Sequence, residues 1–381
     1  MSMELEVVPA GLARVLEELP LVDHHVHGAT SHDLSRTAFE KLLGESDRPV
    51  PDWMTRFDSQ LGFAVLRHCA PVLGLEPFCA PEEYLARRAR IGAHEANRLL
   101  LGASGVGHFL VETGYRAEEL LGPSGMAEAS GAPADEVVRL ESVAEQLAAA
   151  GCGAGEFGRR FAEALWERTG DARGLKTVAA YRCGLDFDPA PPSADEVAAA
   201  AGRWLEEGGR LRDSVLVRHL IWTGLERGLP LQFHIGYGDP DIDLKRSDPL
   251  LLRGLIELAE PTGVPLLLLH CYPFQRHAGY LAQAYPAVFF DVGLALTHVG
   301  ARGSALLAES LEVAPFAKIL YSSDAWGPAE LHYLGALMWR RGMARVLGEF
   351  VLEEEWSVAQ AVHVATMIGA ENARRVYGLG G

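Results

Sequence analysis

The chain contains the run Val264-Pro265-Leu266-Leu267-Leu268-Leu269-His270, an apolar segment that ends in a histidine. Three other apolar runs, at residues 229–234, 288–292 and 319–324, also end in or close to a His or an Asp. Short, continuous apolar runs are typical of strands that are buried on both faces, as in a parallel sheet. Because helical patterns separate the runs, this half of the chain predicts strands that alternate with helices.

Similar segments extend the alternation toward the N-terminus. We expect strands over residues 21–27, 107–114, 137–141 and 175–182. Together with the later runs they make about eight strands, so the simplest architecture is one α/β domain over residues 1–381 with the (β/α)8 TIM-barrel fold. The alternative is a doubly wound open sheet, but the Gly-rich dinucleotide motif that would favour it does not follow the first strand.

The first connection, residues 28–104, is much longer than the others. It has helical periodicity, and several prolines break it into pieces. A long insertion after the first strand of a barrel would lie over the mouth of that barrel. We therefore expect a helical insertion that serves as a lid or as a dimer contact, and we expect the protein to be a homo-oligomer.

Composition limits the partners of the protein. The 34 Lys and Arg residues are outnumbered by 51 Asp and Glu residues, and the net charge of −17 argues against nucleic acid or an anionic membrane surface. We see neither an apolar run long enough to span a bilayer nor the pattern of a signal peptide. The five cysteines form no Cys-x-x-Cys pair, which favours free thiols and a cytoplasmic location. A small molecule is the expected partner.

A histidine pair stands at the end of the first expected strand, in the stretch Asp23-His24-His25-Val26-His27. Side chains alternate along a strand, so His25 and His27 share a face and His24 points away. Neutral imidazole is a common ligand for zinc and related ions. Functional residues of a barrel gather at the C-terminal ends of its strands, where we also expect three further side chains, His234, His270 and Asp324.

The ordered set Asp-x-His-x-His, His, His and Asp at successive strand ends resembles the amidohydrolase superfamily. Within it, the chain is similar to the amidohydrolase 2 branch, and to the amidohydrolase-type domain that is fused to a glutamine-synthetase-like domain in FluG-type proteins. Residues 176–185 and 234–239 carry the second likeness. The resemblance implies a metal-dependent hydrolase that cleaves an amide or related C–N bond of a small polar, carboxylate-bearing substrate with metal-activated water. It also implies the alternative, a metal-dependent non-oxidative decarboxylase, because members of the same branch use a similar site for C–C cleavage.

The resemblance assigns roles to the strand-end residues. His25, His27 and His234 would be metal ligands, and Asp324 would be a ligand, a general base or both. His270 would polarise the substrate in a mononuclear site or become a ligand in a binuclear one. The expected cofactor is one divalent ion, Zn²⁺, with Mn²⁺ or Fe²⁺ as alternatives. The chemistry agrees, because a bound divalent ion lowers the pKa of water toward neutrality.

Many relatives carry a carboxylated lysine at the end of the fourth strand, where it bridges two metals. Lys176 stands at the start of the expected fourth strand, so we expect it in a structural ion pair at the bottom of the barrel, and we expect a mononuclear site. Tyr181 and Arg182 occupy the strand end and are candidate substrate contacts. Arg182 would clamp a substrate carboxylate, since its guanidinium can bind both oxygens, and a structural salt bridge is its alternative role.

Arg139 and Glu141 end the third expected strand on one face. We expect them to contact a carboxylate or ammonium group of the substrate, with pairing to neighbouring residues of the barrel as the alternative.

Overall fold

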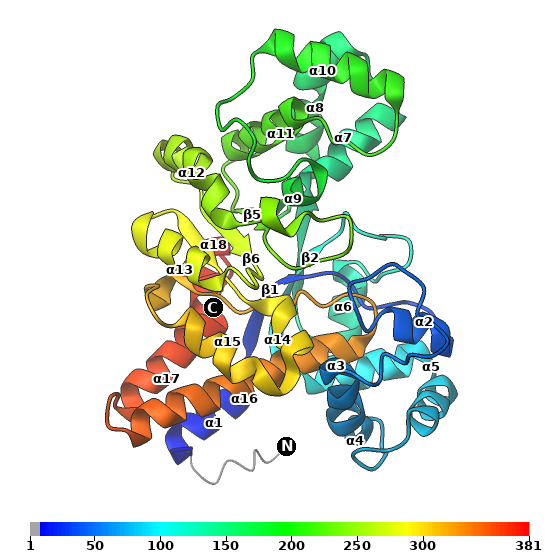
Figure 1. Cartoon of the computed structure of the whole chain (residues 1–381), viewed down its shortest axis with the longest axis vertical. Coiled ribbons are helices and arrows are strands. Elements are labelled where there is room, and N and C mark those ends of the chain that lie inside the picture. The colour runs from blue at the N-terminus through cyan, green and yellow to red at the C-terminus, as the bar shows by residue number, and fades with distance from the viewer. Residues whose placement is uncertain (1–7, 381) are drawn as a thin grey trace.

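A computed structural model describes residues 8–380 of the protein. At its centre lies a parallel sheet whose seven strands are adjacent in chain order (Figure 1). The strands are β1 (Leu21–Val26), β2 (Val106–Glu112), β3 (Ala134–Arg139), β4 (Gly174–Thr177), β5 (Leu231–His234), β6 (Leu266–Leu269) and β7 (Val288–Phe290). Most of their residues are buried, as a sheet covered on both faces requires.

The extended segment of residues 319–324 connects the two edges of this sheet. The backbone N–H of Leu320 donates to the carbonyl oxygen of Phe290 on β7 (3.0 Å), and the N–H of Asp324 donates to the carbonyl oxygen of His25 on β1 (3.0 Å). The segment makes only an isolated bridge to β7, so it is not the regular eighth strand that we expected. The sheet is nonetheless curled, and the fold is TIM-barrel-like, in agreement with the sequence.

Helices surround the sheet. Their bounds are α1 (Ala10–Glu18), α2 (Arg36–Lys41), α3 (Gln60–Ala64), α4 (Ala70–Val72), α5 (Pro81–Ala103), α6 (Pro123–Ser130), α7 (Leu140–Ala149), α8 (Phe157–Arg168), α9 (Ala179–Arg182), α10 (Ala194–Glu207), α11 (Ser214–Arg227), α12 (Arg253–Ala259), α13 (Gln275–Ala284), α14 (Gly293–Val299), α15 (Gly303–Ser310), α16 (Ala329–Leu352), α17 (Val358–Thr366) and α18 (Asn372–Tyr377). Among residues 8–380, none of the helices has the length and apolar character needed to cross a membrane.

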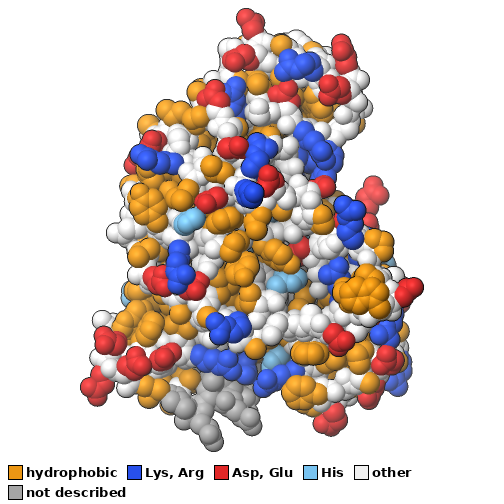
Figure 2. All heavy atoms as spheres, in the orientation of Figure 1, with side chains coloured by type: hydrophobic (Ala, Val, Ile, Leu, Met, Phe, Trp, Pro, Cys, Tyr) orange, Lys and Arg blue, Asp and Glu red, His pale blue; other side chains and the backbone are white. Residues whose placement is uncertain are grey.

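Two groups of helices extend the central part of the molecule. Helices α7, α8, α10 and α11 pack on one another at the top of Figure 1. Helices α2 to α5 come from the connection between β1 and β2, and α5 packs against α16. These last helices occur where the sequence predicts a helical insertion, and its role as a lid or a dimer contact stays a prediction. Acidic and basic side chains are interspersed over the face shown in Figure 2.

The fourth strand is shorter than the sequence suggested. It ends at Thr177, whose hydroxyl donates to Glu141 Oε1 (2.6 Å), and the N–H of Val178 donates to the same oxygen (3.0 Å). The chain turns at this point, and α9 follows. The expected strand over residues 175–182 is therefore wrong in its second half. A short apolar run has no period that would distinguish a strand from a helix.

Candidate functional site

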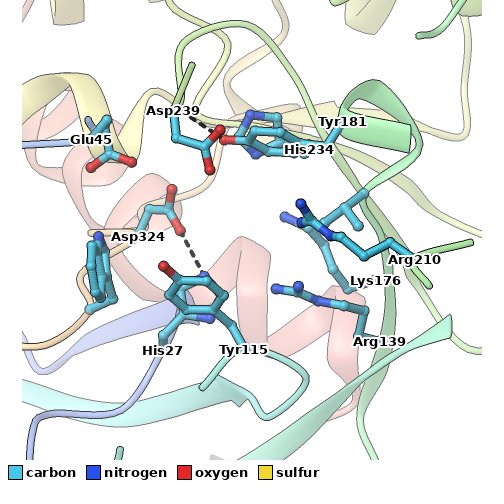
Figure 3. A pocket seen from close by; sticks show the side chains of 12 residues that line it. His27, Glu45, Tyr115, Arg139, Lys176, Tyr181, Arg210, His234, Asp239 and Asp324 are labelled. Carbon is cyan, nitrogen blue, oxygen red and sulfur yellow. Dashed lines mark hydrogen bonds and ion pairs between the residues drawn. The ribbon is translucent and has the colours of Figure 1, made fainter. Parts of the chain in front are cut away.

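A cavity of about 680 Å³, including its open mouth, lies at the C-terminal ends of the strands (Figure 3). This is the end of the barrel at which catalytic residues are found in proteins of this architecture. The lining residues are His27, Glu45, Tyr115, Arg139, Lys176, Val178, Tyr181, Arg210, His234, Asp239, Asp324 and Trp326.

Three of the predicted metal ligands meet at the bottom of the cavity. One nitrogen or oxygen atom each of His25, His27 and Asp324 lies within 4.8 Å of the other two. Nε2 of His25 is 3.0 Å from Asp324 Oδ1, and Nε2 of His27 is 3.6 Å from the same oxygen. The alternation of side chains along β1 thus brings the histidine pair onto the face that the sequence indicated.

His234 and His270 stand beside this cluster, with their ring centroids 4.2 Å apart. Nδ1 of His270 is 2.8 Å from the carbonyl oxygen of Ile235, which can only accept, so Nδ1 carries the proton. The lone pair on Nε2 of His270 therefore faces Asp324 Oδ2, 3.5 Å away. Within residues 8–380, Nε2 of His234 and Nε2 of His270 are buried without a hydrogen-bond partner.

This set of donors fits a divalent cation. Burial and the nearby charge of Lys176 keep the pKa of His25 well below its usual value, and burial with the neighbouring His270 does the same for the pKa of His234. Both rings are thus neutral, which is the form that binds metals. Neutral nitrogens directed at a carboxylate are compensated by a cation between them, and nitrogen with carboxylate is a donor set that suits Zn²⁺.

A buried ion pair orients His27. Nε and Nη2 of Arg139 donate to the two carboxylate oxygens of Glu112 (3.1 and 2.6 Å), and Oε2 of Glu112 is 3.0 Å from Nδ1 of His27. A carboxylate at Nδ1 fixes the ring so that Nε2 faces the cation site. Sequence reasoning missed Glu112. The available signal was a lone carboxylate at the end of β2, the strand next to the histidine pair.

Asp291 holds the other side of the site. Its Oδ1 accepts from the backbone N–H of His270 (2.9 Å) and from the Ser322 hydroxyl (2.7 Å), and its Oδ2 is 3.1 Å from Nε2 of His24. Burial opposes ionisation, but the hydrogen bonds, that of His24 foremost, lower the pKa of Asp291 to about 2. His270 and Asp324 have φ of 47° and 48°, a strained conformation for these residues that the surrounding contacts sustain.

Lys176 lies in the cavity, and its predicted place at the bottom of the barrel is wrong. Because β4 ends at Thr177, Lys176 stands near the C-terminal end of that strand, and its Nζ is 3.4 Å from Nε2 of His25. Burial lowers the pKa of Lys176 to about 8. The sequence argument for a single metal ion rested on the absence of a lysine here, so that argument no longer holds.

The two predicted substrate contacts on α9, Tyr181 and Arg182, lie in different places. Tyr181 lines the cavity, and its hydroxyl accepts from the backbone N–H of Asp239 (3.2 Å). Arg182 does not line the cavity, and its Nη2 is 3.2 Å from Glu145 Oε1. The structure therefore shows Arg182 in the salt bridge that the sequence left as its alternative. The helical turn at α9 directs these two neighbouring side chains to different places, which a strand end would not have done.

Arg139 and Glu141 also lie in different places. Arg139 is the last residue of β3 and lines the cavity, whereas Glu141 belongs to α7 and is buried against Thr177. The expected common face does not exist, because the strand ends between them. Seven lining residues were not proposed as site residues from the sequence: Glu45, Tyr115, Lys176, Val178, Arg210, Asp239 and Trp326. All except Lys176 lie on loops, where no periodic pattern indicates the direction of a side chain.

Comparison with known proteins identifies the family of this chain. The family model described as Amidohydrolase matches residues 120–379. The chain belongs to the amidohydrolase family. Protein fluG of Emericella nidulans is 31% identical over 241 residues, which make up 58% of this chain. The match covers only 28% of that protein, so this amidohydrolase corresponds to a part of its curated relative.

Solved structures of related fold cover nearly the whole chain. A protein of Lactobacillus casei, provisionally named a metal-dependent hydrolase, has a TM-score of 0.85 and 26% identity, and the match covers 96% of this amidohydrolase and 97% of that chain. A uronate isomerase of Bacillus halodurans has a TM-score of 0.67 at 15% identity, over 97% and 96% of the two chains. The second likeness concerns the fold alone.

Proposed function

We propose that this amidohydrolase is a metal-dependent hydrolase that cleaves an amide or related C–N bond of a small polar substrate carrying a carboxylate. The observation that carries the proposal is the convergence of neutral histidine nitrogens on Asp324 at the bottom of the cavity. Membership of the amidohydrolase family supports hydrolysis, and the likeness to the Lactobacillus casei protein supports metal dependence.

Each residue of the site has its own role in the proposed reaction. A divalent ion held by His25, His27, His234 and Asp324 would polarise the substrate carbonyl and lower the pKa of water. Asp324 takes a proton from the attacking water and returns it to the leaving nitrogen. His270 offers a lone pair, because its proton is on Nδ1, and so it acts as a base or a further ligand. It does not donate to the substrate, as the role suggested by the sequence for a mononuclear site would require.

The basic side of the cavity supports the proposal that the substrate carries a carboxylate. Arg139, Lys176 and Arg210 all line it, and guanidinium groups bind carboxylates through paired hydrogen bonds. A cavity at the strand ends that is lined by charged and aromatic side chains suits a small polar molecule.

Two measurements test this function. Metal analysis of protein purified without added metal should find bound divalent ion and give the number of ions per chain. The metal-loaded protein should then release ammonia or an amine from a panel of γ-glutamyl amides and N-acyl amino acids. Aromatic carboxylates in the same panel test the decarboxylase, and release of carbon dioxide without any amine would refute the hydrolase. A protein without bound metal would refute both enzymes.

We also retain as proposals a cytoplasmic location and a homo-oligomer, and the mass in solution from light scattering tests the second.

A further inference from the structure

Two carboxylates that take no part in the proposed reaction face the same cavity. Figure 3 shows Glu45 and Asp239 on one side of it, whereas Arg139, Lys176 and Arg210 approach from the other side. The cavity thus has an acidic wall and a basic wall, and Asp324 lies below Glu45 and Asp239 in this view.

The acidic wall lacks a strong counter-ion of its own. Glu45 follows α2, its side chain is 15% exposed, and the ring of His298 lies beside it, with Nε2 3.5 Å from Oε1. Asp239 lies in the loop after β5, where its Oδ1 accepts the backbone N–H of Asp241 (2.8 Å). Within residues 8–380, neither carboxylate forms an ion pair with a lysine or an arginine.

Each of the two carboxylates also opposes the ionisation of the other. Burial raises the pKa of Asp239, and the negative charges of Asp241 and Glu45 add to this effect. Half-buried like charges on one wall are stabilised when a cation binds between them. The basic wall compensates this charge only in part. The charge of Arg210 lowers the pKa of Asp239, but its Nη1 is 2.6 Å from Asp241, and Arg139 is paired with Glu112.

We propose that Glu45 and Asp239 bind a cationic amino group of the substrate, so that the substrate is a small zwitterion whose carboxylate faces Arg139 and Arg210. An ammonium group has three donors, which suits two carboxylates on one wall. This inference rests on the proposed function for the position of the reacting bond near Asp324. It adds the chemical class of the substrate and two residues that determine specificity.

Calorimetric binding to the metal-loaded protein at neutral pH tests the inference without turnover. The probes are pairs that differ by one amino group: L-glutamate and glutarate, L-aspartate and succinate, 4-aminobutyrate and butyrate. We expect the amino compound to bind at least about tenfold more tightly in one or more pairs, the range of a charge-assisted hydrogen bond. The double variant Glu45→Gln/Asp239→Asn should abolish that preference without weakening the binding of the deaminated partner, because it removes two negative charges that repel an anion. Glu118→Gln, which changes an exposed carboxylate outside the cavity lining, should leave both constants unchanged.

Each outcome bears on one proposal. A lack of preference for the amino compound in every pair, including a lack of any binding, overturns the zwitterion. A preference that persists in the double variant overturns the assignment to Glu45 and Asp239. If the preference is found and the panel releases no amine, the proposed hydrolysis fails while this inference stands. If amides without an amino group are hydrolysed as fast as those that carry one, the zwitterion fails and the hydrolase stands.

Discussion

The substitution Glu112→Gln should destabilise the protein and weaken its metal binding at the same time. Glu112 is buried, and it contacts Arg139 through two hydrogen bonds and His27 at 3.0 Å. Burial alone would raise the pKa of Glu112, but the charge of Arg139, with a smaller effect of the neighbouring His27, holds it well below its usual range. Glutamine keeps the shape of the side chain and removes its charge, so Arg139 becomes a buried cation without a counter-ion.

The expected size of the effect follows from this burial. Breaking a buried ion pair by removing one partner costs ~3–5 kcal/mol of unfolding free energy. Because Glu112→Gln removes the charge and keeps the size of the side chain, we expect a loss near the lower end of this range. The matched control is Glu136→Gln, which breaks the more exposed pair with Arg168 and should cost at most ~1 kcal/mol. Because Glu112 also orients His27, the metal dissociation constant should rise by roughly 10–100-fold in Glu112→Gln alone.

Urea unfolding of the metal-free protein, followed by tryptophan fluorescence, measures the first effect. Competition with a chelator measures the second. The lowered pKa also determines how the free energy of unfolding depends on pH. The stabilisation by ionised Glu112 is complete above the pKa of Glu in the unfolded chain, about 4.3. It is lost as the pH falls through the pKa of Glu112 in the folded protein. The curves of wild type and Glu112→Gln should therefore converge at acid pH. Equal losses in Glu112→Gln and Glu136→Gln at neutral pH, with unchanged metal affinity, would refute the reasoning.

Three further changes test the site. Asp324→Asn should lower kcat/KM by about 10²–10⁴-fold, as expected for loss of a general base, and metal analysis of the same sample should show reduced metal content. Gly238→Ala would place a methyl group 1.9 Å from the Tyr181 hydroxyl, so kcat/KM should fall about 100-fold, whereas Gly102→Ala meets open space and should leave activity unchanged. Lys176→Met should flatten the rise in unfolding free energy of the metal-free protein between pH 8 and about 10.4, because the folded pKa of Lys176, about 8, lies below the value in the unfolded chain. An identical rise in wild type and Lys176→Met would contradict the lowered pKa.

The parts of the site that the sequence predicted are those fixed by strand geometry. His25 and His27 share a face because a strand has a period of two, and His234 and Asp324 follow apolar runs whose ends had to lie at one end of a parallel sheet. The fold was predictable for the same reason, since buried parallel strands require continuous apolar runs. These inferences need only the direction and the order of the strands.

The parts that could not be predicted depend on where a strand stops. The sequence predicted that the fourth strand ends a few residues later than β4 does. The prediction therefore placed Lys176 at the bottom of the barrel instead of in the cavity, and Arg182 at a strand end instead of in α9. The stop itself is set by Glu141, which is distant in sequence from Thr177 and receives its hydrogen bond. A contact of this kind has no local signature, because the two residues meet only after β3 and β4 have paired.

Charge balance is the remaining property that only the structure could supply. The sequence offered Arg139 as a free substrate contact, but Glu112 neutralises much of its charge, and this pair leaves the basic wall weaker than its residues suggest. Glu45 and Asp239 stand far apart in the chain, and no spacing or periodic pattern links them. The folded protein nonetheless places both on one wall, with no lysine or arginine in an ion pair with either among residues 8–380. The selectivity of this amidohydrolase should therefore depend less on the histidines proposed as metal ligands than on these loop carboxylates, whose charge the protein compensates only in part.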